Sequence, residues 1–329
     1  NTWSALAETF MVKYAQRQGL RQSTLRDYRR ALQEPDVEDW FARPVADITR
    51  RDIRNRLDTV AERAPIHANR LRAYWGKFFG WLAEHEWIET SPVLGVARPV
   101  PERTRVRFLT QQEIADVWRA FDATGAAFAG MIKVLLLTGQ RQGEIAGLKW
   151  SEVTGLDGDD PRLELPPERT KNSRPHIVSL SGLAQEVIES VPQIEGGDLV
   201  FSLDGARAIN GWSKLKARLD RAIGEARAEA AGEEKYDAGK HAIPGWTFHD
   251  LRRTLVTGMI EVLGIAPHVV EAVVNHLSGQ SRAGVAGIYN RAVLLPQRRE
   301  ALEAWAKHIH AIVSGVEPAS NVATLKLRA

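Results

Sequence analysis

The sequence predicts a mainly α-helical protein that contains one small antiparallel β-sheet. Apolar side chains recur three and four positions apart through the first hundred residues, which is the period of an amphipathic helix. Three short apolar or alternating runs near the middle of the chain are the strand candidates. At 329 residues the chain is too long for one small core, so we expect two domains.

Residues 1–97 are expected to form a bundle of four short helices, with Ser23 and Thr49 as the N-caps of the second and third. The helices are expected at 2–18, 24–32, 50–63 and 66–86. A single arginine on such a helix is ordinary solvated surface. Repetition on successive helices favours a face that follows the phosphates of a polyanion. The residues that make up this face are Arg50, Arg51, Arg54, Arg70, Arg72 and Lys77.

Residues 98–107 are expected to be a basic linker, stiffened by Pro99 and Pro101. Arg103, Arg105 and Arg107 stand at alternate positions, so an extended chain would point them to one side. Such a connector suits a protein that closes around a polyanion.

The second domain is expected over residues 108–313, with Thr110 capping its first helix and residues 314–329 as a tail. The Ala-, Glu- and Gly-rich stretch 224–245 has little pattern and is expected to be an exposed insertion.

The apolar stripe of 298–313 suits docking either on a neighbouring molecule or on its own domain. Helices are expected at 111–121, 131–137, from 183 onward, from 249, at 267–276 and at 296–313, and strands at 150–153, 162–165 and 176–180, with 199–201 as a further small candidate.

The composition excludes several classes of protein. With 44% hydrophobic and 26% charged residues the chain is ordinary for a globular protein, and no apolar run is long enough to span a bilayer. No signal-peptide pattern opens it, and cytoplasmic residence fits. The absence of cysteine excludes disulfides, thiolate metal sites and a cysteine nucleophile. A net charge of only +3 means that any nucleic-acid surface must come from the placement of charges.

Five short stretches carry groups with chemistry. His249 and Arg252 lie three residues apart and would share a helix face, which suggests an anionic guest such as phosphate. Arg141 has Glu144 as its natural ion-pair partner, and Lys171 sits in the turn 166–173 between two strand candidates. His276 and Tyr289 lie in two further stretches. Each has a plain structural explanation taken singly, as a surface ion pair, a turn residue, a helix cap or a core aromatic.

Their order along the chain resembles the catalytic domain of the tyrosine recombinases, the phage-integrase family. The pattern T-G-x-R-x-x-E-x-x-x-L-x-W is followed by a hairpin lysine, H-D-L-R-R-T, N-H and a tyrosine. The likeness covers residues 105–310, with Thr138, Gly139, Arg141, Glu144, Leu148 and Trp150 in register, and the helical N-terminal part is similar to that family's core-binding domain.

The resemblance implies a fold and a site. It implies a helical core-binding domain, followed by an α+β recombinase catalytic domain. It selects Arg252 over Arg253, which geometry alone could not do, and gives Glu144 the role of holding Arg141. The active-site residues it implies are Arg141, Lys171, His249, Arg252, His276 and Tyr289.

The implied activity is site-specific DNA recombination through a 3′-phosphotyrosyl intermediate, in an integrase of a prophage or mobile element. Its expected partners are double-stranded attachment sites, three further copies of the chain in a tetramer, and accessory DNA-bending or directionality factors. No membrane partner, cofactor or metal is expected. A metal at His249-Asp250 is disfavoured because two arginines flank it. A bacterial or phage-encoded, nucleoid-associated protein is expected.

Three departures and two alternatives stay open. Asn275 stands where many members of the family have glycine, the spacing from His276 to Tyr289 is somewhat long, and residues 224–245 look inserted. Many integrases also carry an N-terminal arm-binding domain, and none is visible in this sequence. The alternatives are a type IB topoisomerase-like enzyme that relaxes supercoils, and a catalytically silent DNA-binding protein on the same scaffold.

Overall fold

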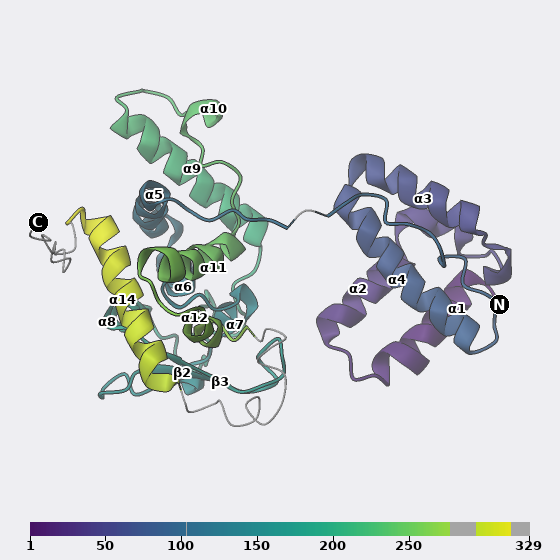
Figure 1. Cartoon of the computed structure of the whole chain (residues 1–329), viewed down its shortest axis with the longest axis horizontal. Helices are drawn as coiled ribbons and strands as arrows, with labels where there is room; N and C mark the ends of the chain where they lie inside the picture. Colours follow the sequence, from purple (N-terminus) through teal and green to yellow (C-terminus); the bar gives the residue numbers. More distant parts are fainter. Residues whose placement is uncertain (103, 277–293, 317–329) are drawn as a thin grey trace, which may run out of the picture. The chain divides into compact units, whose positions relative to one another are not determined.

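The computed structural model describes residues 1–102, 104–276 and 294–316. The chain divides into two compact units, Asn1–Arg105 and Val106–Ala329, which are described separately (Figure 1). The expectation of a mainly helical protein with one small antiparallel sheet is confirmed. No helix in the described ranges combines the length and apolar character needed to cross a bilayer.

The first unit is a helical bundle around an aromatic core. Its helices are α1 (Trp3–Phe10), continued by the π-helical η1 (Met11–Gln16), then α2 (Gln22–Leu32), α3 (Arg50–Arg63) and α4 (Pro65–Glu84), with 3-10 turns η2 (Pro35–Trp40) and η3 (Val45–Asp47) between α2 and α3.

Two buried tryptophans of this core also satisfy backbone groups. The indole Nε1 of Trp3 donates to the carbonyl oxygen of Leu32 at 2.8 Å, and that of Trp75 donates to the carbonyl oxygen of Ala31 at 2.9 Å. The last carbonyls of a helix have no partner within the helix. The same side chains therefore fill the core and close the end of α2.

Local capping explains where several helices begin. Thr49 is the N-cap of α3, as expected, and it forms a capping box with Asp52. Thr110 accepts from the backbone of Glu113 at 3.2 Å, as expected at the next unit's first helix. The expected cap at Ser23 is wrong, because α2 begins at Gln22 with Arg21 in the N-cap position.

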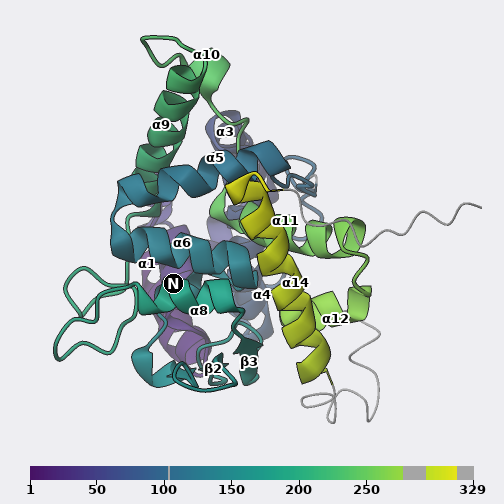
Figure 2. The same ribbon diagram turned by 90° about the vertical axis from the view of Figure 1, so that its left-hand side faces the viewer.

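The second unit is built around the apolar helix α6, whose residues are almost all buried. Helices α5, α8, α11 and α14 pack against it (Figure 2). The Trp305 indole of α14 reaches the carbonyl oxygen of Leu136 on α6 at 2.9 Å. The helices of this unit are α5 (Gln111–Phe121), α6 (Ala126–Thr138), α7 (Gln142–Ala146), α8 (Gly182–Glu189), α9 (Trp212–Ala230), α10 (Ala238–His241), α11 (Phe248–Thr257), the π-helical η6 (Gly258–Val262), α12 (Pro267–Val273) and α14 (Leu295–Ser314).

A three-stranded antiparallel sheet completes this unit. Its order is β1 (Val153–Thr154), β2 (Arg162–Leu165), β3 (His176–Ser179), with Leu163 opposite Val178. The expected strand 150–153 is mostly wrong, because Trp150–Glu152 forms a 3-10 turn. The small strand expected at 199–201 is present as a single bridge from Leu199 to Lys149.

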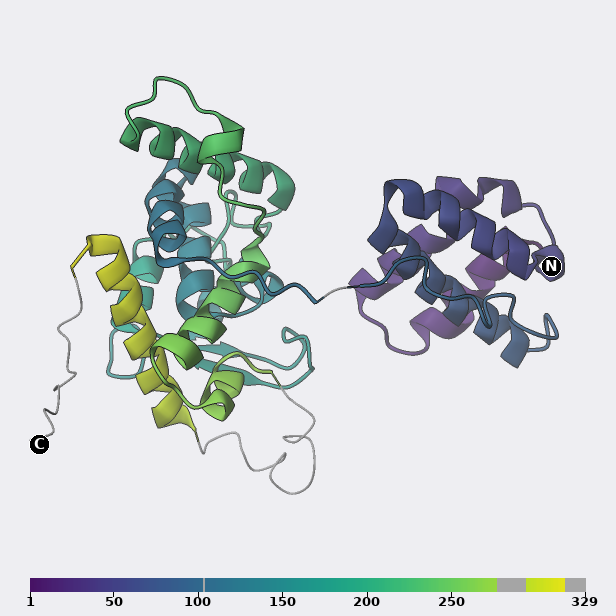
Figure 3. The same cartoon turned by 45° about the horizontal axis from the view of Figure 1, so that its top comes forward.

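The expected exposed insertion at 224–245 is wrong at its start, where residues 224–230 belong to helix α9, whereas residues 231–240 are exposed apart from the partly buried Tyr236. Helix α9 continues to Ala230 and packs against α5 (Figure 3). Ile223 and Ala228 are buried, and the Arg227 guanidinium pairs with Asp116 on α5 at 2.7 Å. The helical start of the segment therefore packs on the domain through Ala228 and Arg227, while Ala226 and Ala230 are exposed.

The apolar stripe of α14 packs on its own domain. Leu302, Trp305 and Ile309 are each no more than 2% exposed, and Ile312 lies against the same core. The close fit also involves Gly258, where an added Cβ would lie 2.4 Å from the Trp305 ring. This decides between the two alternatives for the stripe: it is not a free surface for a neighbouring molecule.

Candidate active site

An open groove of the second unit gathers basic residues that are expected to carry chemistry. Its lining comes mainly from the turn after α6, the turn before β3, and α11, η6 and α12 with the segment that follows it. The groove has a volume of about 690 Å³. The site residues that line it are Arg141, Lys171, His249, Arg252 and His276, with Arg253 beside them.

Arg141 is placed by the turn that ends α6. Gly139 ends that helix with φ +63°, a conformation that strains a side chain, and an added Cβ there would lie 3.0 Å from Leu255. The chain therefore turns tightly and begins α7 at Gln142. The Arg141 backbone N–H and Nη1 both donate to the Glu144 carboxylate, at 3.3 and 3.1 Å. Glu144 is only 3% exposed, so it fixes the direction of the Arg141 side chain.

Arg252, on α11, is held by backbone carbonyl groups. Its Nη1 donates to the Gly139 oxygen at 2.7 Å, and its Nη2 donates to the Val274 oxygen at 2.6 Å. The side chain is almost fully buried, and this burial lowers its pKa to about 10, which leaves the guanidinium charged at neutral pH. A fixed positive charge thus faces the groove.

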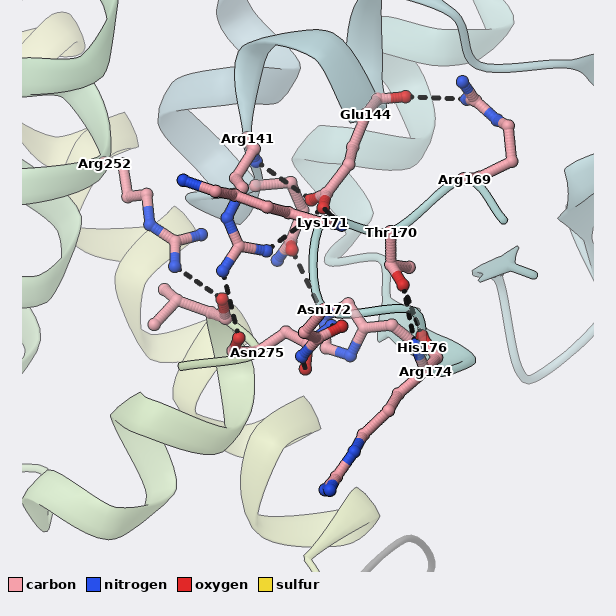
Figure 4. Close-up of polar contacts among 12 residues, drawn as sticks. Arg141, Glu144, Arg169, Thr170, Lys171, Asn172, Arg174, His176, Arg252 and Asn275 are labelled. Carbon is pink, nitrogen blue, oxygen red and sulfur yellow. Dashed lines mark hydrogen bonds and ion pairs between the residues drawn. The ribbon is translucent and has the colours of Figure 1, made fainter. Parts of the chain in front are cut away.

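The end of α12 organises both arginines. Arg141 Nη2 donates to the Asn275 carbonyl oxygen at 3.2 Å, next to the Val274 carbonyl that binds Arg252 (Figure 4). The last carbonyls of a helix carry partial negative charge and attract cations. His276 follows directly and lines the groove. Two guanidinium groups and one imidazole therefore meet at one helix end.

Lys171 lies in a turn that is anchored on both sides. Its backbone N–H donates to Glu144 at 3.1 Å, so one carboxylate holds both Arg141 and the Lys171 backbone. Arg169, two residues earlier, pairs with Glu152 at 2.8 Å and donates to the Glu144 carbonyl oxygen at 2.8 Å. The Lys171 side chain is exposed and extends in the direction of Arg252 (Figure 4).

His249 is arranged to stay neutral. Partial burial and the neighbouring Arg253 and Arg252 hold its pKa below the usual value. Arg253 pairs with the buried Asp250 at 2.6 Å, and Asp250 also caps α11 through Thr247. Arg253, which the resemblance does not select, is therefore tied to the start of α11 by an ion pair. A neutral imidazole on the groove can accept a proton.

Sequence reasoning missed a buried polar group behind the groove. His176 Nε2 lies 3.2 Å from the Gln140 amide oxygen and 3.2 Å from the Val273 carbonyl oxygen. The Gln140 amide nitrogen donates to Thr138 and to Val273, at 2.8 and 3.0 Å. Burial and nearby arginines lower the His176 pKa to about 3, so the ring is neutral. This network joins β3 to the end of α12. In the sequence, the position of Gln140 inside the T-G-x-R pattern is the one feature that could have predicted a polar contact here.

The residues expected to bind DNA differ in their surroundings: some are exposed, some have contacts within the chain, and one lies outside the described residues. Arg50, Arg51, Arg54, Arg70 and Lys77 are exposed on α3 and α4. Three of the acids of this unit, Asp36, Asp39 and Asp52, pair with other arginines. Several of the expected residues have internal contacts. Arg72 donates to the Val96 carbonyl oxygen at 2.6 Å, Arg107 pairs with Glu113 at 2.6 Å, and the Lys77 ammonium lies over the Tyr14 ring at 4.9 Å from its centroid. Arg105 is exposed, and Arg103 and Tyr289 lie outside the described residues.

Comparison with known proteins places this groove in a family. The model of the Phage integrase family matches residues 107–292, more than half of the chain. The chain belongs to the phage integrase family. Members of this family are tyrosine recombinases, and the chain is a site-specific DNA recombinase of the integrase type.

Individual relatives agree with this assignment. The chain is 26% identical to the prophage integrase IntZ of Escherichia coli K12, over 90% of this chain and 69% of that protein. It is also 26% identical to the shufflon-specific DNA recombinase of Escherichia coli, over 70% of this chain and 54% of that protein. The chain thus spans about half to two thirds of the length of these relatives.

Solved structures share the fold. A lambda integrase tetramer bound to a Holliday junction matches with a TM-score of 0.64 and 18% identity, over 87% of this chain and 80% of that one. The Tn1549 transposon integrase in complex with circular intermediate DNA matches with a TM-score of 0.59 and 14% identity, over 89% and 99%. At these identities the likeness concerns the fold.

Proposed function

We propose that this chain cuts and rejoins DNA strands at specific sites, with Tyr289 as the nucleophile and the groove as its phosphate site. The observation that carries the proposal is the gathering of Arg141, Lys171, His249 and Arg252 on one groove with His276. A cluster of cationic side chains suits a phosphodiester, whose charge grows as it is attacked.

The proposed step is a transesterification. The Tyr289 oxygen attacks phosphorus and forms a P–O bond while the bond to the 5′ oxygen breaks. His249 accepts the phenol proton, and Lys171 donates a proton to the departing 5′ oxygen. The products are a 3′-phosphotyrosyl link and a free 5′-hydroxyl. Because the phosphoester bond is kept, a partner strand's 5′-hydroxyl can reverse the step without a metal or nucleotide.

The remaining groups stabilise charge. The guanidinium forks of Arg141 and Arg252 match the non-bridging oxygens in a way that a lysine ammonium does not. His276 donates a hydrogen bond to the same phosphate. Glu144 takes no part in the chemistry and holds Arg141 in place, which its 3.1 Å contact supports.

We infer that the substrate is duplex DNA carrying two attachment sites, with four copies of the chain assembled on them. Support comes from the lambda integrase neighbour, solved as a tetramer on a Holliday junction. The exposed basic face of α3 and α4 would follow the DNA backbone. The chain would integrate or excise a prophage or mobile element, within the bacterial cytoplasm and helped by accessory factors.

A nicked suicide substrate carrying the candidate site tests this proposal. The chain should form a covalent adduct that survives denaturation, and Tyr289→Phe should form none while still binding DNA. Joints between two duplexes are expected, because relaxation of supercoils alone would favour a topoisomerase. An intact, DNA-bound protein that forms no adduct would contradict the proposal.

A further inference from the structure

Two asparagines next to site residues join the two halves of the groove. Asn172 follows Lys171 in the turn before β3, and Asn275 precedes His276 after α12. The Asn172 Nδ2 donates to Asn275 Oδ1 at 2.7 Å, and the Asn275 Nδ2 donates to Asn172 Oδ1 at 3.3 Å (Figure 4). Each amide therefore acts as both donor and acceptor toward the other. We call this contact the amide pair.

The amide pair completes the anchoring of the Lys171 turn. On one side the Lys171 backbone is bound to Glu144 at 3.1 Å. On the other side the amide pair holds the next residue against the segment that carries His276. The Lys171 side chain is long and exposed, so its reach into the groove depends on where its backbone is fixed.

Asn275 also has a backbone role that can be separated from its side chain. Its φ of 50° lies in the left-handed region, which asparagine and glycine tolerate better than other residues. Its carbonyl oxygen receives the Arg141 Nη2 at 3.2 Å. Glycine would keep the backbone and this carbonyl contact but lose the amide. An asparagine here therefore adds a contact that a glycine could not supply.

We propose that Asn172 and Asn275 are positioning residues that set the distance of Lys171 from the scissile phosphate. This rests on the proposed function, since it assigns Lys171 as the proton donor to the 5′ oxygen. Both amides are half-buried, which shields the pair from competing water. Loss of the amide pair removes the contact between the Lys171 turn and the segment after α12. The contact between His176 and Val273 remains and still joins β3 to α12 behind the groove.

A substrate that needs no proton donor separates positioning from general damage. In a 5′-bridging phosphorothiolate the leaving group is a thiolate, which departs without protonation because a thiol is far more acidic than an alcohol. On the ordinary 5′-oxygen substrate, Asn172→Ala should slow single-turnover cleavage roughly 10- to 100-fold. On the sulfur substrate the same variant should cleave within about threefold of the unaltered chain.

Asn275→Gly gives a second, independent variant, because it retains the left-handed backbone and the carbonyl that binds Arg141. It should show the same oxygen-specific loss as Asn172→Ala. Lys171→Ala is the reference for complete loss of the donor, with the largest difference between the two substrates. Glu168→Gln, an exposed change in the same turn, is the matched control and should leave both rates within about twofold.

The outcomes are distinguishable. Equal losses on both substrates, or no loss on either, would overturn the positioning role of the amide pair while leaving the proposed function intact. If the unaltered chain forms no adduct on either substrate, the proposed function itself fails. DNA affinity, measured by titration, should change by less than about twofold in both asparagine variants, because neither removes a charge.

Discussion

Replacing Arg252 by lysine tests whether the shape of this side chain matters as well as its charge. The guanidinium uses two different nitrogens to reach the Gly139 and Val274 oxygens, at 2.7 and 2.6 Å. A lysine has all its donors on one atom and cannot reach both oxygens and a phosphate in this geometry. One buried carbonyl is left without a partner, at a cost of about 1–3 kcal/mol.

The same change should be visible in both stability and activity. For a domain of this size the loss corresponds to a melting temperature lower by roughly 2–12 °C, measured by scanning calorimetry. Cleavage of the suicide substrate should fall roughly 10²- to 10³-fold, as expected when a donor to the developing charge is removed.

Arg253→Lys is the matched control for this prediction. Arg253 contacts Asp250 through one nitrogen, Nη1, at 2.6 Å, and its side chain is 32% exposed, so a lysine can keep the ion pair. Its cleavage rate should stay within about threefold of the unaltered chain. Equal damage from both substitutions, or a fully active Arg252→Lys, would refute the assignment of Arg252 to the phosphate.

Three further predictions concern acidity and backbone shape. Because the proposed base His249 has a lowered pKa, cleavage should stay level from neutral pH down to about 6.5 and fall only below it. His249→Ala should lose this acid limb in a single-turnover pH profile. His176 is neutral in the fold with a pKa of about 3, so protonation of the unfolded chain removes stability as the pH falls from about 6.5 toward 3. Urea unfolding should show that about 2 kcal/mol of the loss between pH 7.5 and pH 5 disappears in His176→Gln. Gly139→Ala should destabilise by about 1–3 kcal/mol because of its positive φ and the neighbouring Leu255, whereas Gly143→Ala, in open space on α7, should be neutral or slightly stabilising. If Gly143→Ala costs as much in thermal melts as Gly139→Ala, the backbone argument is wrong.

Sequence alone predicted best what depends on neighbouring residues. The caps at Thr49 and Thr110 need only four consecutive positions, and the structure has both. The strands predicted at 162–165 and 176–180 are present at 162–165 and 176–179, because alternation is a local signal. The extent of α9 was not predicted, because its stability depends on contacts such as Arg227 with Asp116, which lie 111 positions apart.

The same distinction applies to the groove. The side chains expected to carry the chemistry could be named because the family resemblance assigns them from short stretches of sequence, each of which can be recognised on its own. Their supporting contacts could not be named, since the amide pair joins residues 103 positions apart. Whether an apolar stripe such as that of α14 covers its own core or a neighbour also depends on packing that periodicity does not report.

The carbonyl groups of Gly139, Val274 and Asn275 have a consequence for how this protein can vary. Every amino acid supplies a carbonyl, so these hydrogen bonds to Arg252 and Arg141 do not themselves require a particular residue, and the choice at Gly139 and Asn275 is restricted by their positive φ instead. Related chains can therefore diverge at residue 274 while the arginines keep the same support. What must be preserved is the path of the main chain, so an insertion or deletion near the end of α12 should be far more damaging than most substitutions there.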